Sequence, residues 1–194
     1  MPLSQSFYGR VFNRSTGIIL AVLALAGVPS MMFTARQAGS HPAFTLSSTS
    51  FSSHGSIPSR YTCSGQNVSP DLRWSGPPKG AVAYALIVTD PDAPSHTWVH
   101  WVAYNLPAAE RELPGGIAKG KQIHTGGIQG LNDFHDLGYG GPCPPPGKPH
   151  RYFFTLYALN APLPLPPGAT RRQVEEAMKG HVLAQAVLMG MFGQ

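Results

Sequence analysis

Short apolar runs separated by turns dominate the chain from residue 44 onward and predict β-strands. Residues 81–89 are apolar almost throughout, over the length of a strand, which is typical of a strand buried on both faces. Residues 99–106 and 152–159 are rich in aromatic and β-branched side chains and predict two further strands. Residues 44–47 and 72–74 alternate between apolar and polar positions, as half-buried strands do.

One helix is predicted near the C-terminus. Thr170 and Gln173 have the spacing of a capping box, and apolar residues recur at helical intervals after them, at Val174, Met178 and Val182. We expect the helix to end near Ala186 and residues 187–192 to return as a strand.

The segment 107–139 carries a weak pattern with many glycines, and we predict only a short strand near residues 122–123. The whole pattern predicts a mainly β fold, an antiparallel β-sandwich with the C-terminal helix on its flank.

Composition agrees with a turn-rich β protein and bounds its size. The chain has 194 residues, enough for one domain and a short extension, with 22 glycines, 20 prolines and only 12% charged residues. The formal net charge of +5 is scattered, and no basic cluster resembles a footprint for a phosphate backbone. We therefore expect no nucleic-acid partner.

Residues 1–43 read as a targeting segment rather than as part of the fold. Arg10 and Arg14 precede an apolar stretch at residues 17–28, the layout of a secretory signal peptide. An uncleaved membrane anchor followed by a linker is the alternative, and it would be the chain's one membrane contact. Either interpretation places a single domain at residues 44–194 and exports it to the periplasm, free or anchored to the inner membrane.

The predicted export bears on the state of the two cysteines. Cys63 and Cys143 both lie in turn-like sequence, and an oxidising compartment would permit a disulfide between them. The alternative is two small buried thiols, and the sequence leaves the choice open.

Two Pro-rich turns carry the candidate chemistry. Asp90-Pro91-Asp92-Ala93-Pro94 follows the buried strand and leads to His100, and Gly140-Gly141-Pro142-Cys143-Pro144-Pro145-Pro146-Gly147 leads to His150. Polar groups on loops that are held by a rigid sheet are typical of binding sites. Imidazoles of His100 and His150 suit recognition of phosphate or another small oxyanion, although each histidine by itself also fits a buried core position.

The neighbouring residues have expected supporting roles. One of Asp90 and Asp92 should orient a histidine while the other holds the turn, and the spacing does not say which. Gly141 and Pro142 belong to a backbone that can approach a ligand closely, with N–H donors expected near Gly141 or Cys143. Tyr152 could place its hydroxyl in the pocket. Arg151 would then point to the opposite face and act as a structural ion-pair partner.

The two motifs together resemble the phosphatidylethanolamine-binding protein family, in its bacterial Raf-kinase-inhibitor-like branch. The likeness extends over residues 44–192, including Cys63-Ser64-Gly65-Gln66-Asn67-Val68-Ser69-Pro70. It implies a Greek-key-type sandwich in which a large antiparallel sheet packs on a smaller one, with an anion-binding cavity at one rim. Carried over by motif, the ligand-binding residues would be Asp90, Asp92, His100, Gly141, Pro142, His150 and Tyr152.

The resemblance predicts a non-enzymatic binding protein for phosphate, phosphorylated head groups or similar anions, with no cofactor. A protein-interaction module that inhibits a protease or kinase is the first alternative. A metal-dependent hydrolase, with Asp90, Asp92, His100 and His150 as ligands, is the second. Phe192 stands where many relatives have a tyrosine, and the predicted export makes a cytoplasmic kinase an unsuitable target.

Overall fold

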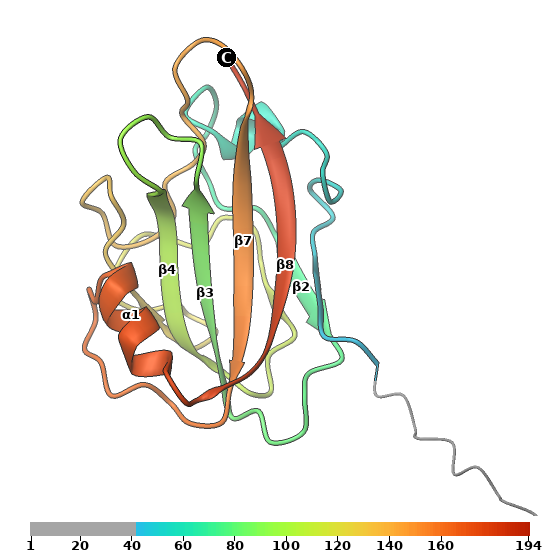
Figure 1. Cartoon of the computed structure of the whole chain (residues 1–194), viewed down its shortest axis with the longest axis vertical. Coiled ribbons are helices and arrows are strands. Elements are labelled where there is room, and N and C mark those ends of the chain that lie inside the picture. The colour runs from blue at the N-terminus through green and yellow to red at the C-terminus, as the bar shows by residue number, and fades with distance from the viewer. Residues whose placement is uncertain (1–41) are drawn as a thin grey trace, which may run out of the picture. The chain divides into compact units, whose positions relative to one another are not determined.

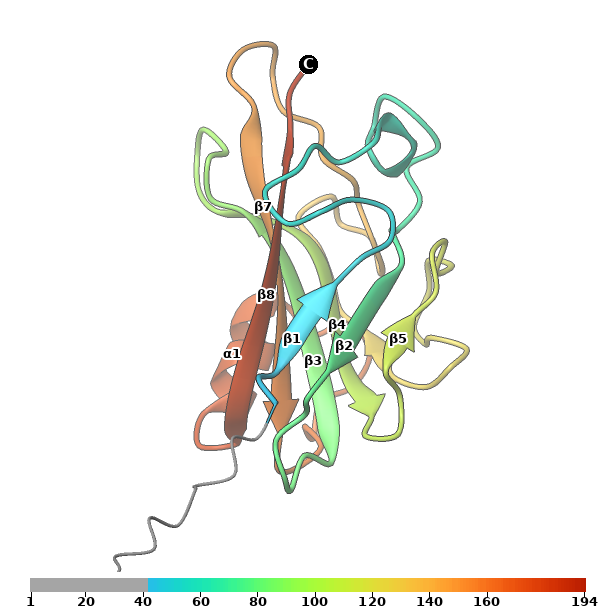
Figure 2. The same cartoon turned by 90° about the vertical axis from the view of Figure 1, so that its right-hand side faces the viewer.

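Two antiparallel β-sheets face each other in the computed structural model, which describes residues 42–194 (Figures 1 and 2). The five-stranded sheet has the order β6-β4-β3-β7-β8, and its strands are β3 (Ala83–Asp90), β4 (Trp98–Pro107), β6 (Ile128–Gln129), β7 (His150–Leu159) and β8 (Val182–Phe192). The three-stranded sheet has the order β1-β2-β5, with β1 (Thr45–Ser47), β2 (Leu72–Ser75) and β5 (Glu112–Leu113). The predicted mainly β sandwich, with a larger sheet on a smaller one, is confirmed.

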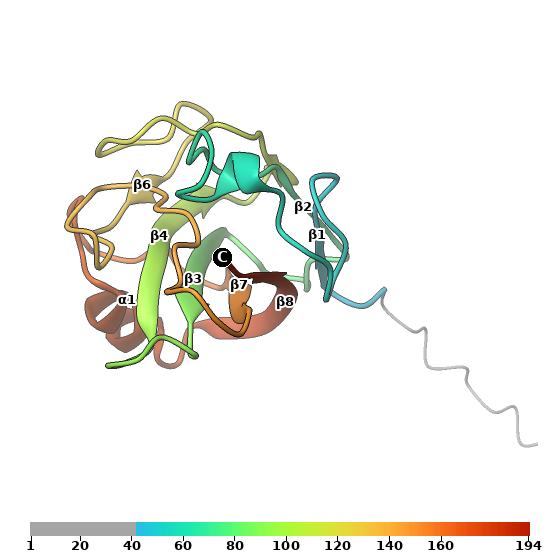
Figure 3. The ribbon, with the colours of Figure 1, turned by 90° about the horizontal axis from the view of Figure 1, so that it is seen from above.

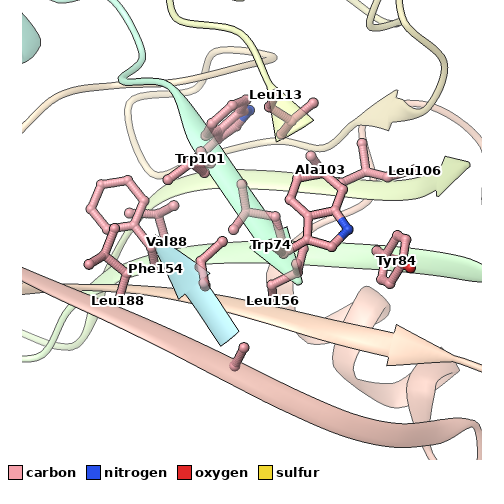
Figure 4. Close-up of a cluster of buried hydrophobic side chains, with 14 of the residues drawn as sticks. Trp74, Tyr84, Val88, Trp101, Ala103, Leu106, Leu113, Phe154, Leu156 and Leu188 are labelled. Atoms are coloured by element: carbon pink, nitrogen blue, oxygen red, sulfur yellow. The ribbon is translucent and has the colours of Figure 1, made fainter. Parts of the chain in front are cut away.

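The larger hydrophobic core lies between the sheets. Trp74 of β2 and Leu113 of β5 contribute from the small sheet, and Trp101 of β4 and Phe154 of β7 contribute from the large one (Figure 4). Burying large side chains such as these supplies most of the stabilisation of such a fold, at about 25 cal/mol per Å² of apolar surface.

A second core fills the opposite face of the large sheet, under helix α1 (Arg171–Met178) (Figure 1). Ala85 and Ile87 of β3 point into it, and Val174 and Met178 of the helix cover them. Because β3 is covered on both faces, it contains the continuous apolar run that the sequence showed.

The helix is shorter and the last strand longer than predicted. The capping box of Thr170 and Gln173 is present, but the helix ends at Met178, and β8 starts at Val182. Gly180 has φ of 78°, a left-handed conformation that turns the chain out of the helix. Residues 182–186 therefore pair with β7 instead of continuing the helix, and the predicted boundary near Ala186 is wrong.

The predicted strand at residues 122–123 is also wrong. Gln122 makes only an isolated bridge to Ile128, and the regular strands of this segment are β5 and β6. Each is two residues long, so periodicity could not have revealed it.

Loops that are distant in sequence gather at one end of the large sheet (Figures 1 and 3). The loop between β3 and β4, the segment that leads into β7 and the C-terminus lie there, near the short 3₁₀ helix η1 (Ser59–Tyr61). The two Pro-rich turns singled out by the sequence are thus neighbours.

The predicted targeting segment, residues 1–43, falls outside the described residues apart from its last two positions. Between residues 42 and 194, no helix has the length and apolarity needed to cross a membrane.

Candidate functional site

A pocket with a volume of about 170 Å³ opens where the two Pro-rich turns meet. Three ionisable residues line it: Asp90 at the end of β3, His100 in β4 and His150 at the start of β7. Its other lining residues are mainly apolar or aromatic, namely Ala93, Pro94, Trp98, Phe134, Cys143, Pro144 and Pro145. Among residues 42–194, no lysine or arginine lines the pocket, so its two histidines are the groups there that can carry a positive charge.

His150 is oriented by Asp90. Its Nδ1 lies 2.7 Å from Oδ2 of Asp90, and both side chains are largely buried. A carboxylate can only accept, so Nδ1 carries the hydrogen and Nε2 is left for other partners. Nε2 is a lone-pair acceptor in the neutral ring and a donor in the imidazolium cation.

His100 is oriented by the backbone of the second turn. Its Nδ1 donates to the carbonyl oxygen of Gly140 at 2.6 Å, and its own carbonyl accepts the Gly140 N–H at 2.8 Å. Burial lowers the pKa of His100, which favours the neutral ring. With Nδ1 protonated, Nε2 of neutral His100 can only accept a hydrogen bond.

Asp92 takes the structural role and does not line the pocket. Its carboxylate accepts from the backbone N–H and from Nε and Nη2 of Arg151, at 2.7 to 2.9 Å. These hydrogen bonds from Arg151 lower the pKa of Asp92 from 3.8 to about 2. Asp90 therefore orients the histidine and Asp92 holds the turn, and Arg151 is the ion-pair partner that its position predicted.

The four residues of the metal-site alternative are not gathered as ligands. Asp92 is engaged by Arg151, and the described residues contain no group of three or more His, Cys, Asp or Glu side chains that could hold a metal ion.

Gly141 and Pro142 lie behind the pocket wall rather than on it. The Gly141 N–H donates to Oδ1 of Asn67 at 2.7 Å, and the Pro142 carbonyl accepts from the Cys63 N–H at 3.0 Å. A Cβ on Gly141 would lie 2.4 Å from the Tyr61 carbonyl oxygen. The expected donor at Gly141 is therefore already used, and the glycine serves close packing against η1 instead of ligand approach.

Tyr152 is buried beneath the site. It is fully inaccessible, and its ring contacts His100 edge-on with centroids 5.2 Å apart. Its hydroxyl has no hydrogen-bond partner in the described structure, and burial, followed by the charge of Asp90, raises its pKa. Tyr152 supports the imidazole of His100 but does not line the pocket mouth.

Two aromatic residues of the pocket wall escaped the sequence analysis. Trp98 and Phe134 pack edge-on with centroids 5.4 Å apart, and Phe134 also packs against His100. Phe134 comes from the segment with a weak pattern, so the sequence held no signal for it. A Cβ on Gly140 would lie 2.4 Å from the Phe134 ring, so the ring can occupy this position only because residue 140 is a glycine.

A disulfide joins the pocket wall to the segment after η1. Cys63 and Cys143 are bonded, with their Cα atoms 5.3 Å apart and a sequence separation of 80. Cys143 lines the pocket, and the bond fixes the Pro-rich segment from behind.

Sequence comparison identifies the family to which this fold and pocket belong. The model of the family described as phosphatidylethanolamine-binding protein matches residues 47–193, which is most of the chain. The chain belongs to the phosphatidylethanolamine-binding protein family. Phe192 pairs in register with His150 but does not line this pocket.

Relatives and solved structures agree with membership of the phosphatidylethanolamine-binding protein family. A protein from Methanothermobacter thermautotrophicus named UPF0098 protein is 50% identical over 147 residues, covering 76% of this chain and 97% of its own. A crystal structure from Chlamydia trachomatis, described as a homolog of phosphatidylethanolamine-binding protein, has a TM-score of 0.71 and 41% identity, covering 78% of this chain and 98% of its own. The structure of Escherichia coli YbcL, described as a member of the mammalian family, has a TM-score of 0.74 and 33% identity, covering 79% and 99%.

Proposed function

We propose that this protein is a non-enzymatic binding protein whose pocket takes a small anion, such as phosphate or a phosphorylated head group. The observation that carries the proposal is the convergence of Asp90, His100 and His150 in one small pocket with apolar walls. Sites of this kind, concave and mostly apolar with a few placed polar groups, are typical of small-ligand binding.

The size and the polar groups of the pocket favour a small anion over a large one. Nδ1 of His150 lies 2.7 Å from Oδ2 of Asp90, which leaves Nε2 of the ring for a ligand. Trp98 adds an indole N–H that is buried without a partner in residues 42–194. The volume of about 170 Å³ suits a phosphate group rather than a complete phospholipid.

We further propose that the protein acts outside the cytoplasm, in the periplasm. The disulfide between Cys63 and Cys143 supports this location, because such bonds persist in oxidising compartments. The apolar stretch at residues 17–28 after two arginines supports it independently.

The test is calorimetric titration of the full-length protein with inorganic phosphate and phosphoethanolamine. We expect saturable binding by wild type and at least about a tenfold loss of affinity in His150→Ala, because the variant lacks the imidazole that Asp90 orients in the pocket. His124→Ala is the matched control, since His124 is exposed and does not line the pocket.

The circular dichroism spectrum of His150→Ala should overlay that of wild type. A loss of binding can then be assigned to the missing side chain and not to unfolding. Wild type that binds neither anion would contradict the proposal. Unchanged affinity in a folded His150→Ala protein would contradict the assignment of this histidine.

A further inference from the structure

One part of the pocket wall, residues 143–148, is tied to the rest of the protein by the disulfide and not by its backbone. Three of these six residues are prolines, which have no N–H to donate. None of the backbone–backbone hydrogen bonds found within residues 42–194 involves this stretch, which lies outside the strands. The bond from Cys143 to Cys63 therefore replaces the hydrogen bonds that hold an ordinary segment in place.

The stretch is anchored only where it begins and ends. Before it, the Pro142 carbonyl accepts from the Cys63 N–H, and after it, His150 pairs with Phe192 of β8. Between these points, Gly147 has φ of 145°, and a Cβ there would have no neighbour within 4 Å. A glycine in open space adds freedom to the chain, so the position of the wall depends on its crosslink.

The same disulfide lies where a reductant can reach it. Both Cys63 and Cys143 are exposed, and Cys143 lines the pocket next to Pro144 and Pro145. Exposed disulfides are more readily reduced than buried ones and include most of those that regulate a protein. One sulfur atom thus belongs both to the wall of the pocket and to an accessible redox group.

We propose that the disulfide between Cys63 and Cys143 is a redox switch for the pocket, with the oxidised protein as the form that binds the anion. This inference rests on the proposed anion-binding function and adds its regulation. A dithiol would supply two electrons and two protons: the S–S bond breaks, both cysteines become thiols, and the dithiol closes to its own disulfide.

The physical reason is the entropy of the released wall. In the oxidised protein the wall is ordered before the ligand arrives, whereas in the reduced protein binding must order it again. Ordering the backbone of even one residue costs enough to weaken binding by about tenfold. Coupling between two sites is reciprocal, so a bound anion must also oppose reduction by the same factor.

The first experiment is calorimetric titration of the full-length protein with inorganic phosphate, before and after reduction by dithiothreitol without air. We expect the reduced protein to bind phosphate at least about tenfold more weakly. The double variant Cys63→Ser with Cys143→Ser should match the reduced protein and should not respond to the reductant. Circular dichroism of the reduced protein should overlay that of the oxidised protein.

The second experiment measures the reciprocal effect. The full-length protein is equilibrated with mixtures of reduced and oxidised dithiothreitol, in saturating phosphate or in chloride of equal ionic strength, and its thiols are counted. A tenfold difference in affinity should lower the midpoint potential in phosphate by about 30 mV. His150→Ala should show no difference between phosphate and chloride, because it lacks the imidazole that Asp90 orients in the pocket.

The outcomes separate this inference from the proposed function. Equal phosphate affinity of the oxidised and the reduced protein would overturn the switch and leave the anion pocket standing. A disulfide that dithiothreitol cannot reduce in the folded protein would overturn the switch too, and so would unfolding upon reduction. Oxidised wild type that binds no phosphate would overturn both the switch and the proposed function.

Discussion

Asp90 and Asp92 are two positions apart and have opposite roles, because only one of them faces a histidine. Oδ2 of Asp90 contacts Nδ1 of His150, while its Oδ1 accepts the Asp92 N–H at 2.8 Å. Asp92 turns its carboxylate to Arg151 at the surface. The first aspartate therefore tunes the pocket, and the second fixes the turn that carries the first.

The pair of Asp92 and Arg151 should make stability depend on pH in the acidic range. The folded-state pKa of Asp92 is about 2 and its ordinary value is 3.8, so its contribution is complete above pH 3.8 and is lost as the pH falls toward 2. In urea denaturation at several pH values, Asp92→Asn should show a shallower fall in the free energy of unfolding across that window.

Arg151→Gln provides the matched comparison, because it breaks the same pair from the other side. Both variants should show the same shallower pH dependence. A slope equal to that of wild type in either variant would show that the pair contributes nothing measurable, as many exposed pairs do.

At the scale of elements, the segment 140–146 is held from three directions. Gly140 is hydrogen-bonded to His100, and Gly141 is hydrogen-bonded to Asn67. Cys143 is joined to Cys63 by the disulfide. Prolines add rigidity between these attachments, since each fixes its own backbone φ. The wall of the pocket is thus rigid before a ligand arrives, and preorganisation reduces the entropy cost of binding.

Gly141→Ala should test how tightly this segment packs. The new Cβ would lie 2.4 Å from the Tyr61 carbonyl oxygen and 2.6 Å from Oδ1 of Asn67, so the segment must shift. We expect a loss of about 1–3 kcal/mol in the free energy of unfolding, measured by chemical denaturation.

Gly115→Ala is the control for that substitution, because its nearest contacts would be at an ordinary 3.4 Å. Its effect should stay within about 0.5 kcal/mol. Similar losses in both variants would mean that close packing at Gly141 is not the cause.

At the scale of the whole molecule, the disulfide connects the segment after η1 with the pocket wall across 80 residues of chain. Such a crosslink restricts the unfolded chain over a long loop, and native disulfides stabilise by about 2–4 kcal/mol in this way. It also ties the pocket to the remainder of the sandwich.

Replacing both cysteines by serine should lower stability by about 2–4 kcal/mol in denaturant titrations. Wild type in a dithiol reductant should lose a similar amount, whereas the double variant should not respond to the reductant. Wild type that is equally stable with and without reductant, with reduction verified by thiol titration, would contradict this role.

The sequence by itself determined strands β1 to β4 and β7, the cap of the helix and the two turns that carry the pocket. Apolar runs and alternation are local consequences of burial on one or both faces, so β3, β4 and β7 could be predicted from them. Proline and aspartate likewise fix turns through local chemistry. The resemblance to the family then supplied the sheet arrangement and the residues to inspect.

Only the tertiary structure decided what depends on distant partners. Residues 182–186 have a helical pattern and form a strand, because hydrogen bonding to β7 outweighs local preference. Phe134 lines the pocket and Tyr152 lies beneath it, and both positions depend on tertiary packing that the spacing of residues in the sequence does not reveal. The hydrogen-bonding state of His100 was likewise undetermined until the carbonyl of Gly140, forty positions away in sequence, was placed beside its Nδ1.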